Sequence, residues 1–204
     1  MTASPKTRRG QATVEVILDV ACDLFTRRGI RATTLDDIGS AAGVGRGQIY
    51  HFFNGKSDIV AGVTTRQIRL VLDELEPVLG SMSTASDVRD LRTALVAYHS
   101  KVGAAVRCPM GVLIHQLSDA DQAAWAALQS GFRQWEELLV QGLAQVAAHG
   151  ELKRGADPRR LAAGFLAAYQ GGLLLAELHG DLNCLELALD TVIAAALVPA
   201  DREV

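Results

Sequence analysis

The sequence predicts an all-α protein. Its 204 residues include only five prolines, and apolar residues recur at spacings of three and four along almost the whole chain, which is the period of an amphipathic helix. Alternation of apolar and polar residues, the pattern of a half-buried strand, is scarce. We therefore expect helices throughout, with enough core for one small domain and one larger domain.

Nine segments carry this helical period, and glycine, proline or small polar residues separate them. In chain order they are about 13–28, 35–42, 46–52, 57–77, 87–102, 111–117, 123–148, 158–178 and 182–197. Gly29 and Gly43 end the first two, because glycine readily takes the left-handed conformation that follows a helix. Pro77 is expected to end or kink the fourth, and Asp157 with Pro158 to cap and begin the eighth.

The second and third segments form a short helical pair. Thr34 can cap the second helix while the carboxylate of Asp37 favours its positive end. In the third helix Ile49 faces inward, with Phe53 just beyond its end. Two short helices joined by a tight turn with glycine, and braced by a preceding helix, are typical of a helix-turn-helix. The third helix would then read DNA in the major groove.

The exposed face of the third helix carries side chains suited to nucleic acid. Arg46 and Gln48 can each make bidentate contacts with bases. Lys56 directly precedes a helix N-terminus, where free amides also attract a phosphate. The candidate DNA contacts are Thr33, Thr34, Arg46, Gly47, Gln48, Tyr50, His51 and Lys56.

Residues 34–56, TLDDIGSAAGVGRGQIYHFFNGK, resemble the DNA-binding signature of the tetracycline-repressor (TetR) family, and the resemblance covers about residues 10–63. It implies a nine-helix fold, homodimerisation through the last two helices, and release of DNA when a small-molecule effector binds. A two-fold dimer would bind near-palindromic operator DNA. Repression rather than activation is the default in this family.

The two domains expected from this resemblance meet at the start of the fourth helix. Residues 1–56 would be the DNA-binding domain, with a flexible basic arm over about 1–10, and residues 57–204 the effector-binding and dimerisation domain. Effector binding would tilt the long fourth helix and change the spacing of the two DNA-binding heads. The two heads would then no longer engage one site together.

Three positions depart from the family pattern. Gly39, Gly45 and Phe52 stand where alanine, serine and histidine are usual. A glycine N-cap costs only a few tenths of a kcal/mol relative to serine, so we expect the third helix to form. Because Gly43, Gly45 and Gly47 lie together, we expect this helix to fray without DNA.

The larger domain holds candidates for an effector cavity. Aromatic residues make up only 5% of the chain, and most of them are expected in the core. A subset can line an apolar cavity that has a few polar groups, which predicts a hydrophobic or aromatic effector. The candidate residues are His99, Met110, His115, Trp125, Phe132, Trp135, Phe165, Tyr169 and Gln170.

Cys108 is a candidate redox sensor, because the neighbouring Arg107 would favour a reactive thiolate. The alternative is a small packed side chain in a bend, marked by Pro109 and Gly111, between two helices.

Charge and composition predict a cytoplasmic protein. Residues 1–60 hold eight Lys or Arg against six Asp or Glu, and the rest twelve against seventeen. A mildly basic N-terminal part and an acidic remainder fit a DNA-binding domain followed by a domain that does not bind DNA.

The chain has no uninterrupted apolar stretch of about 18 residues, which argues against a membrane span. Residues 1–10 lack the apolar core of a signal peptide. Three widely spaced cysteines argue against a disulfide framework.

We expect neither catalysis, nor a metal, nor a cofactor. Histidines show no pair at metal-ligand spacing, and no nucleophile, base and orienting group come together. The run Gly55-Lys56-Ser57 resembles the end of a phosphate-binding loop, but Tyr50 stands where that loop needs glycine and no strand precedes it.

Two alternatives remain open. Residues 34–56 can be a buried helical hairpin with no role in DNA binding. The whole chain can also be a helical enzyme or carrier for a hydrophobic compound, whose first helices are only scaffold.

Overall fold

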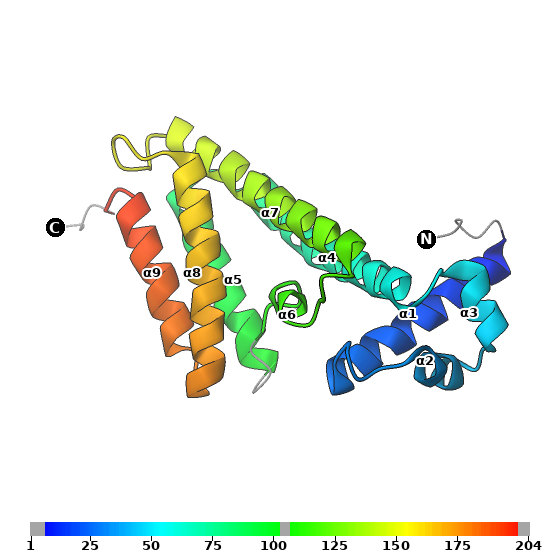
Figure 1. Cartoon of the computed structure of the whole chain (residues 1–204). Helices are drawn as coiled ribbons and strands as arrows, with labels where there is room; N and C mark the ends of the chain where they lie inside the picture. Colours follow the sequence, from blue (N-terminus) through cyan, green and yellow to red (C-terminus); the bar gives the residue numbers. More distant parts are fainter. Residues whose placement is uncertain (1–6, 103–106, 200–204) are drawn as a thin grey trace. The chain divides into compact units, whose positions relative to one another are not determined.

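The computed structural model of the chain describes residues 7–102 and 107–199. Over these ranges the chain forms helices and no strand (Figure 1), and its one strand-like pairing is an isolated bridge between Leu152 and Leu197. The helices are α1 (Arg8–Arg28), α2 (Leu35–Ala42), α3 (Arg46–Phe52), α4 (Lys56–Ser81), α5 (Ala85–Val102), α6 (Gly111–Ile114), α7 (Gln122–Ala148), α8 (Pro158–His179) and α9 (Asn183–Ala196). The all-α prediction is confirmed.

The chain divides into two compact units. Unit 1 comprises Met1–Leu70 together with Val112–Gly131, and unit 2 comprises Val71–Gly111 together with Phe132–Val204. The helices α4 and α7 each contribute residues to both units. The segment between α6 and α7, although distant in sequence, therefore belongs to the same unit as α1, α2 and α3.

The core of unit 1 consists of apolar side chains from its helices. Its fully buried members include Ile17, Ala21, Ile38, Ile49, Phe53 and Ile59. The turn between α2 and α3 is tight: a Cβ added at Gly39 would lie 3.0 Å from the carbonyl oxygen of Val44. This close approach gives a physical reason for glycine at position 39.

α1 begins five residues earlier than the sequence predicts. The Thr7 side chain accepts a hydrogen bond from the amide of Gly10 at 3.1 Å and caps the helix there. Residues 8–10, expected in a flexible arm, are therefore helical, because a threonine cap satisfies a free amide of the first turn. Residues 1–6 of that arm lie outside the described part of the chain.

Pro77 does not end α4, although a helix end is one of the two outcomes that the sequence predicts for it. The helix continues to Ser81, so only three residues separate it from α5, which begins at Ala85. Leu79 and Met82, just past the proline, are almost fully buried in unit 2. Gly142 of α7 lies against this segment, since a Cβ there would be 3.0 Å from the carbonyl oxygen of Leu79. Burial of this last turn offsets the hydrogen bond that proline cannot donate.

In unit 2, α8 and α9 lie side by side and run in opposite directions (Figure 1). They approach closely at Gly172, where an added Cβ would lie 2.8 Å from the Cα of Leu185. α5 packs on α9, and Arg92 of α5 forms ion pairs with Glu186 and Asp190 at 3.0 and 2.8 Å. α6 is shorter than the predicted 111–117.

One helix of the described residues, α8, is long and apolar enough to cross a membrane by length and composition alone. A core helix of a soluble protein passes the same test, so this observation is weak evidence for a membrane span.

Candidate DNA interface and effector cavity

α2 is capped at both ends as the sequence predicts. The Thr34 hydroxyl accepts from the Asp37 amide at 3.1 Å, and an Asp37 carboxylate oxygen accepts from the Thr34 amide at 2.8 Å. The hydrogen bonds from the hydroxyl and amide of Thr34 hold the pKa of Asp37 below its usual value, and the charge of Arg28 adds to this effect. Gly43 ends the helix in the left-handed conformation at φ 66°.

α3 exposes a polar face to solvent and packs its opposite face into the core of unit 1. Ile49 is fully buried, as is Phe53 at the end of the helix. The predicted contact residues of this helix are all exposed: Arg46, Gly47, Gln48, Tyr50 and His51.

The N-terminus of α3 is capped by Gln48 instead of the missing serine. Gly45 has no side chain, but the amide of Gly45 donates to Oε1 of Gln48 at 3.2 Å. Gln48 thus has a structural role in addition to the DNA contact that the sequence suggests.

Arg46 lies near an acidic neighbour on α2. Its Nε is 3.4 Å from Oδ1 of Asp36, and both side chains are largely exposed. Exposed ion pairs contribute at most about 1 kcal/mol, so a DNA phosphate can replace this carboxylate.

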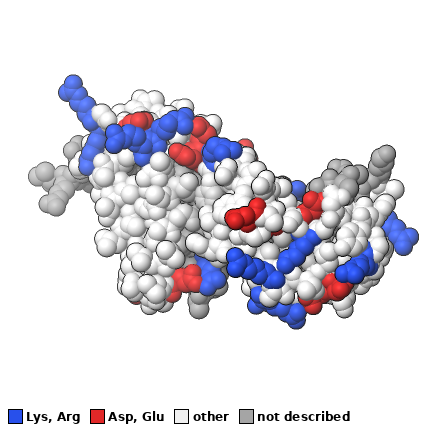
Figure 2. Space-filling model, viewed as in Figure 1, with Lys and Arg blue, Asp and Glu red and all other residues white. Residues whose placement is uncertain are grey.

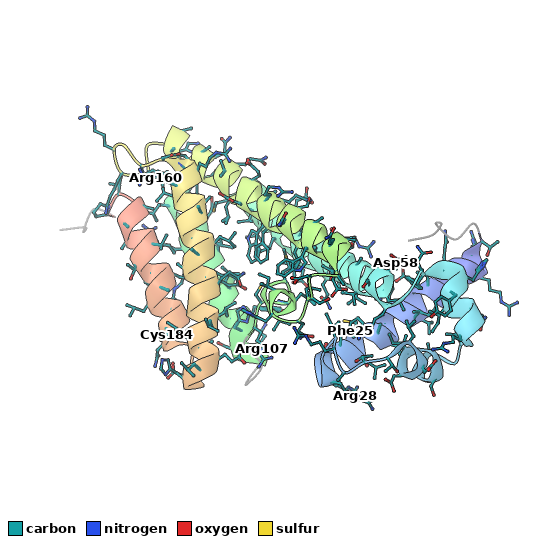
Figure 3. All side chains as sticks on the ribbon, viewed as in Figure 1. Phe25, Arg28, Asp58, Arg107, Arg160 and Cys184 are labelled. Carbon is teal, nitrogen blue, oxygen red and sulfur yellow. The ribbon has the colours of Figure 1, made fainter. Side chains whose placement is uncertain are left out.

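Lys56 is the first residue of α4, and its Nζ donates to the carbonyl of Arg31 at 3.4 Å. In the same turn Asp58 (Figure 3) accepts from the backbone and side-chain amides of Asn54, both at 2.9 Å. The hydrogen bond from the Asn54 backbone amide is the main reason that the pKa of Asp58 is low.

Thr33 differs from the other predicted DNA contacts. It is fully buried, and its hydroxyl donates to the carbonyl of Gly29 at 2.9 Å. This placement gives no support to a phosphate contact from its side chain, because the hydroxyl does not face solvent.

Sequence reasoning missed two polar residues of the α6–α7 segment in unit 1. Oε1 of Gln116 accepts a hydrogen bond from the amide of Ile30 at 3.2 Å. Asp121 is buried, and its carboxylate accepts from the Ser118 amide and hydroxyl at 2.9 and 2.6 Å. Nothing local in the sequence signals the contact of Gln116, whereas Ser118 and Asp121 have the spacing of a helix cap.

The environment of Asp121 connects this segment to the start of α4. Burial acts to raise the pKa of Asp121, but the hydrogen bonds from Ser118, a hydrogen bond from Ser57 and the charge of Lys56 outweigh it. The net result is a pKa below the usual aspartate value. Asp121 is therefore an anion held beside the first turn of α4.

Unit 2 contains a cavity of about 180 Å³. Its walls come from α4, α5, α7, α8 and the segment before α6. The lining residues are Val71, Glu74, Leu75, Val78, Leu91, Ala94, Leu95, Tyr98, Cys108, Pro109, Trp135 and Tyr169. The wall is thus mainly apolar, with two aromatic residues buried in it, Trp135 and Tyr169.

Some predicted cavity residues are found in or beside this wall. Trp135 and Tyr169 line it, and His99 is buried behind Tyr169 with its Nε2 2.8 Å from the phenol oxygen. Burial lowers the pKa of His99 and raises that of Tyr169, so both are uncharged at neutral pH.

Other predicted cavity residues do not line this cavity. His115 and Trp125 belong to unit 1, where His115 is exposed and the indole of Trp125 donates to the Ser118 carbonyl. Four others belong to unit 2 without lining the cavity: Met110 and Phe165, which are buried, Phe132, which stacks on Trp135, and Gln170. The position of a residue along a helix could not show by itself whether its side chain lines this cavity.

Sequence reasoning also missed the contribution of α4 to the cavity. Val71, Leu75 and Val78 recur at spacings of four and three, the period of one helix face. This signal identifies an apolar face, but not that the face borders a cavity.

Cys108 lines the cavity and is buried. The guanidinium of the neighbouring Arg107 (Figure 3) forms an ion pair with Glu177. The redox role of Cys108 stays a prediction, and this ion pair gives Arg107 another partner. Among the described residues, no group of three or more His, Cys, Asp or Glu is placed to hold a metal ion.

Comparison with known proteins agrees with this geometry. A solved SmeT–triclosan complex superposes with a TM-score of 0.75 at 30% identity, over 93% of this chain and 94% of that one. SmeT, the repressor of the Stenotrophomonas maltophilia multidrug efflux pump SmeDEF, also superposes with a TM-score of 0.70 at 28% identity, over 94% and 93%. An uncharacterized HTH-type transcriptional regulator in the lacX 3′ region of Lactococcus lactis subsp. lactis is 26% identical over 180 residues, 87% of this chain and 90% of that protein.

Two family matches cover the helix-turn-helix and most of the remaining helices. Residues 17–63 match the family of bacterial regulatory proteins of the tetR type, and residues 85–192 match the tetracyclin repressor-like C-terminal domain. The second match alone spans more than half of the chain. The chain therefore belongs to the TetR family and is a DNA-binding transcriptional regulator of the helix-turn-helix type.

Proposed function

We propose that this regulator is a homodimeric repressor that leaves its operator when a small hydrophobic or aromatic molecule enters the cavity of unit 2. The observation that carries the DNA-binding part is the exposed polar face of α3 over the buried Ile49. Residues 1–56 form the proposed DNA-binding domain, and 57–204 the effector-binding and dimerisation domain. We place its action in the cytoplasm, where bacterial DNA is.

The proposed DNA-contacting surface consists of α3 together with the N-terminal ends of α2 and α4. Arg46, Gln48 and His51 reach bases or phosphates in the major groove. Tyr50 and Lys56 contact phosphates, and the backbone at Gly47 allows close approach. Thr34, at the start of α2, adds a backbone contact, because its hydroxyl is already engaged with Asp37.

An apolar surface on α8 and α9 supports the homodimer. Figure 2 shows a broad uncharged area over these helices. Its exposed leucines and their exposed fractions are Leu174 (63%), Leu175 (44%), Leu178 (74%) and Leu187 (69%). A patch of this kind marks an interaction surface, and two such helix pairs form a four-helix bundle. The resulting two-fold symmetry calls for near-palindromic DNA with half-sites roughly 34–36 Å apart.

α4 supports a link between effector and DNA. Lys56 is its first residue, and Val71, Leu75 and Val78 of the same helix line the cavity. A ligand that favours one position of this helix changes the population of DNA-binding conformations. The structure of SmeT with triclosan adds support, since that related repressor holds a small aromatic compound.

The direct test is a mobility-shift titration on the DNA upstream of the protein's own gene, at several salt concentrations. We expect a specific shift, and Arg46→Ala weakens it by about 1–3 kcal/mol if Arg46 contacts a base. If Arg46 contacts a phosphate, the substitution instead reduces the salt slope by about one. Arg69→Ala, an exposed arginine on α4, is the matched control. Absence of any specific shift at modest salt contradicts the proposal.

The carrier alternative is tested with the double variant Arg46→Ala, Lys56→Ala. A regulator loses DNA binding and keeps its ligand, because neither side chain lines the cavity. A carrier that never bound DNA loses nothing measurable.

A further inference from the structure

We propose that the cavity of unit 2 selects a small single-ring amine: its apolar wall holds the ring, and Glu74 receives the ammonium group. This inference rests on the proposed function of the cavity as the effector site and specifies the charge and size of the effector. Three properties of the wall support it, namely its volume, its charge and the uncharged state of its buried polar groups.

The volume limits the size of the ligand. The cavity measures about 180 Å³, whereas pockets for drug-sized ligands measure roughly 300–1,000 Å³. A single ring with a short side chain fills this space. The cavity is open to solvent at Val78 and Tyr98, which are 43% and 46% exposed, so a longer ligand would extend out of it.

The charge of the wall selects against anions. Glu74, which is exposed to solvent, is the one charged residue among the twelve that line the cavity, and neither lysine nor arginine is among them. The ion pairs of the described residues do not include Glu74. A ligand carboxylate would therefore meet like charge and no cation among the lining residues, while an ammonium would meet an anion that forms no ion pair within the described part of the chain.

The deep wall contains two aromatic side chains and no compensating positive charge. Trp135 and Tyr169 lie edge to face with ring centroids 5.4 Å apart, and aromatic faces attract cations within about 6 Å. His99, behind Tyr169, is neutral because burial lowers its pKa. The phenol of Tyr169 keeps its proton, because burial raises its pKa. Glu74 therefore carries the only formal charge among the residues that line the cavity.

Three probes of one skeleton test the charge preference. Calorimetric titration at pH 7 compares 2-phenylethylamine, a cation, with 2-phenylethanol, which is neutral, and with phenylacetate, an anion. We expect the amine to bind about fivefold tighter than the alcohol, the combined effect of an exposed ion pair and a cation–π contact. Phenylacetate is expected to bind more weakly than the alcohol.

The variant Glu74→Gln isolates the carboxylate. We expect it to bring the amine to within about twofold of the alcohol while the affinity for the alcohol is unchanged. Glu76→Gln is the matched control, because Glu76 is exposed on the same helix and does not line the cavity. The control is expected to retain the full preference for the amine.

Several outcomes overturn the inference: equal or tighter binding of the alcohol or the acid, an amine preference of more than about twofold in Glu74→Gln, or no binding of any probe at millimolar concentration. The mobility shift of the unliganded protein is measured in parallel. An intact specific shift with the wrong order of ligands overturns only the charge inference. Loss of that shift overturns the proposed repressor function itself.

Discussion

Oε1 of Gln116 accepts a hydrogen bond from the backbone amide of Ile30 at 3.2 Å. The two residues are 86 positions apart, and Ile30 is buried directly after the end of α1. The α6–α7 segment thereby satisfies a backbone group next to the helix-turn-helix. Residues in the middle of the chain help to hold the DNA-binding helices in place.

Gln116→Ala is expected to lower the free energy of unfolding by about 1 kcal/mol, because the part-buried amide of Ile30 loses its partner. Urea unfolding measures this change, and hydrogen exchange at Ile30 is expected to speed up. Gln129→Ala, on the exposed face of α7, is the control and leaves both quantities within about 0.5 kcal/mol of the wild type. Unchanged exchange at Ile30 in Gln116→Ala contradicts the prediction.

Asp121→Asn is expected to lose stability at neutral pH by about 1 kcal/mol. The pKa of Asp121 in the folded protein lies below the ordinary value of 3.8. Its charge therefore contributes stability that is present above about pH 4 and is lost as the pH falls through the folded pKa. Urea unfolding from pH 7 to pH 3 should show the two proteins converging at the acid end. A constant difference across this range would show that the charge is not responsible.

Gly45→Ser is expected to stabilise the protein by about 0.5–1 kcal/mol. Gly45 has φ −74° and nothing lies within 4 Å of an added Cβ, so serine fits, caps α3 and restricts the unfolded chain. Gly43→Ser is the matched control and is expected to destabilise by about 1–2 kcal/mol, because φ there is +66°.

The same pair of variants tests whether α3 frays without DNA. Amide exchange in α3 should slow in Gly45→Ser. Strong protection of α3 in the wild type already contradicts the expectation of fraying.

Leu178→Arg is expected to convert the proposed dimer to a monomer at micromolar concentration. Leu178 is 74% exposed at the end of α8, and a buried, unpaired charge in an interface is costly. Light scattering after size exclusion measures the mass. Leu70→Arg, an exposed leucine of unit 1, should remain dimeric. A dimeric Leu178→Arg would place the interface elsewhere.

Local rules predicted the helix-turn-helix well, because its signals lie within a few residues of one another. Thr34, Asp37 and Gly43 form the expected caps of α2, and Ile49 and Phe53 are buried as expected. Local residue preferences did not predict helix ends that depend on packing against residues distant in sequence. Pro77 predicts the end of a helix or a kink in it. Burial of the following turn in unit 2 lets α4 continue past this proline.

The cavity was harder to predict than the DNA-binding face. An aromatic residue that fills a core and one that lines a cavity look alike in sequence, so Trp125 and His115 were grouped with Trp135 and Tyr169. The sequence does not single out Glu74, because an acidic residue on a long helix is ordinarily solvated, and Glu74 is indeed exposed. Its place beside an apolar wall depends on how four helices and a loop meet.

The position of Asp36 beside Arg46 has a consequence for how the regulator searches the genome. The Asp36 carboxylate is an anion, as a DNA phosphate is, so the guanidinium of Arg46 already has an anionic partner in the free protein. Nonspecific DNA offers Arg46 only phosphate charge when it displaces Asp36, whereas operator DNA also offers matching bases. Displacement of Asp36 therefore yields less binding free energy on nonspecific DNA. If Arg46 contacts a base, as proposed, Asp36 weakens nonspecific DNA binding more than operator binding, and its removal would lower the ratio of specific to nonspecific affinity.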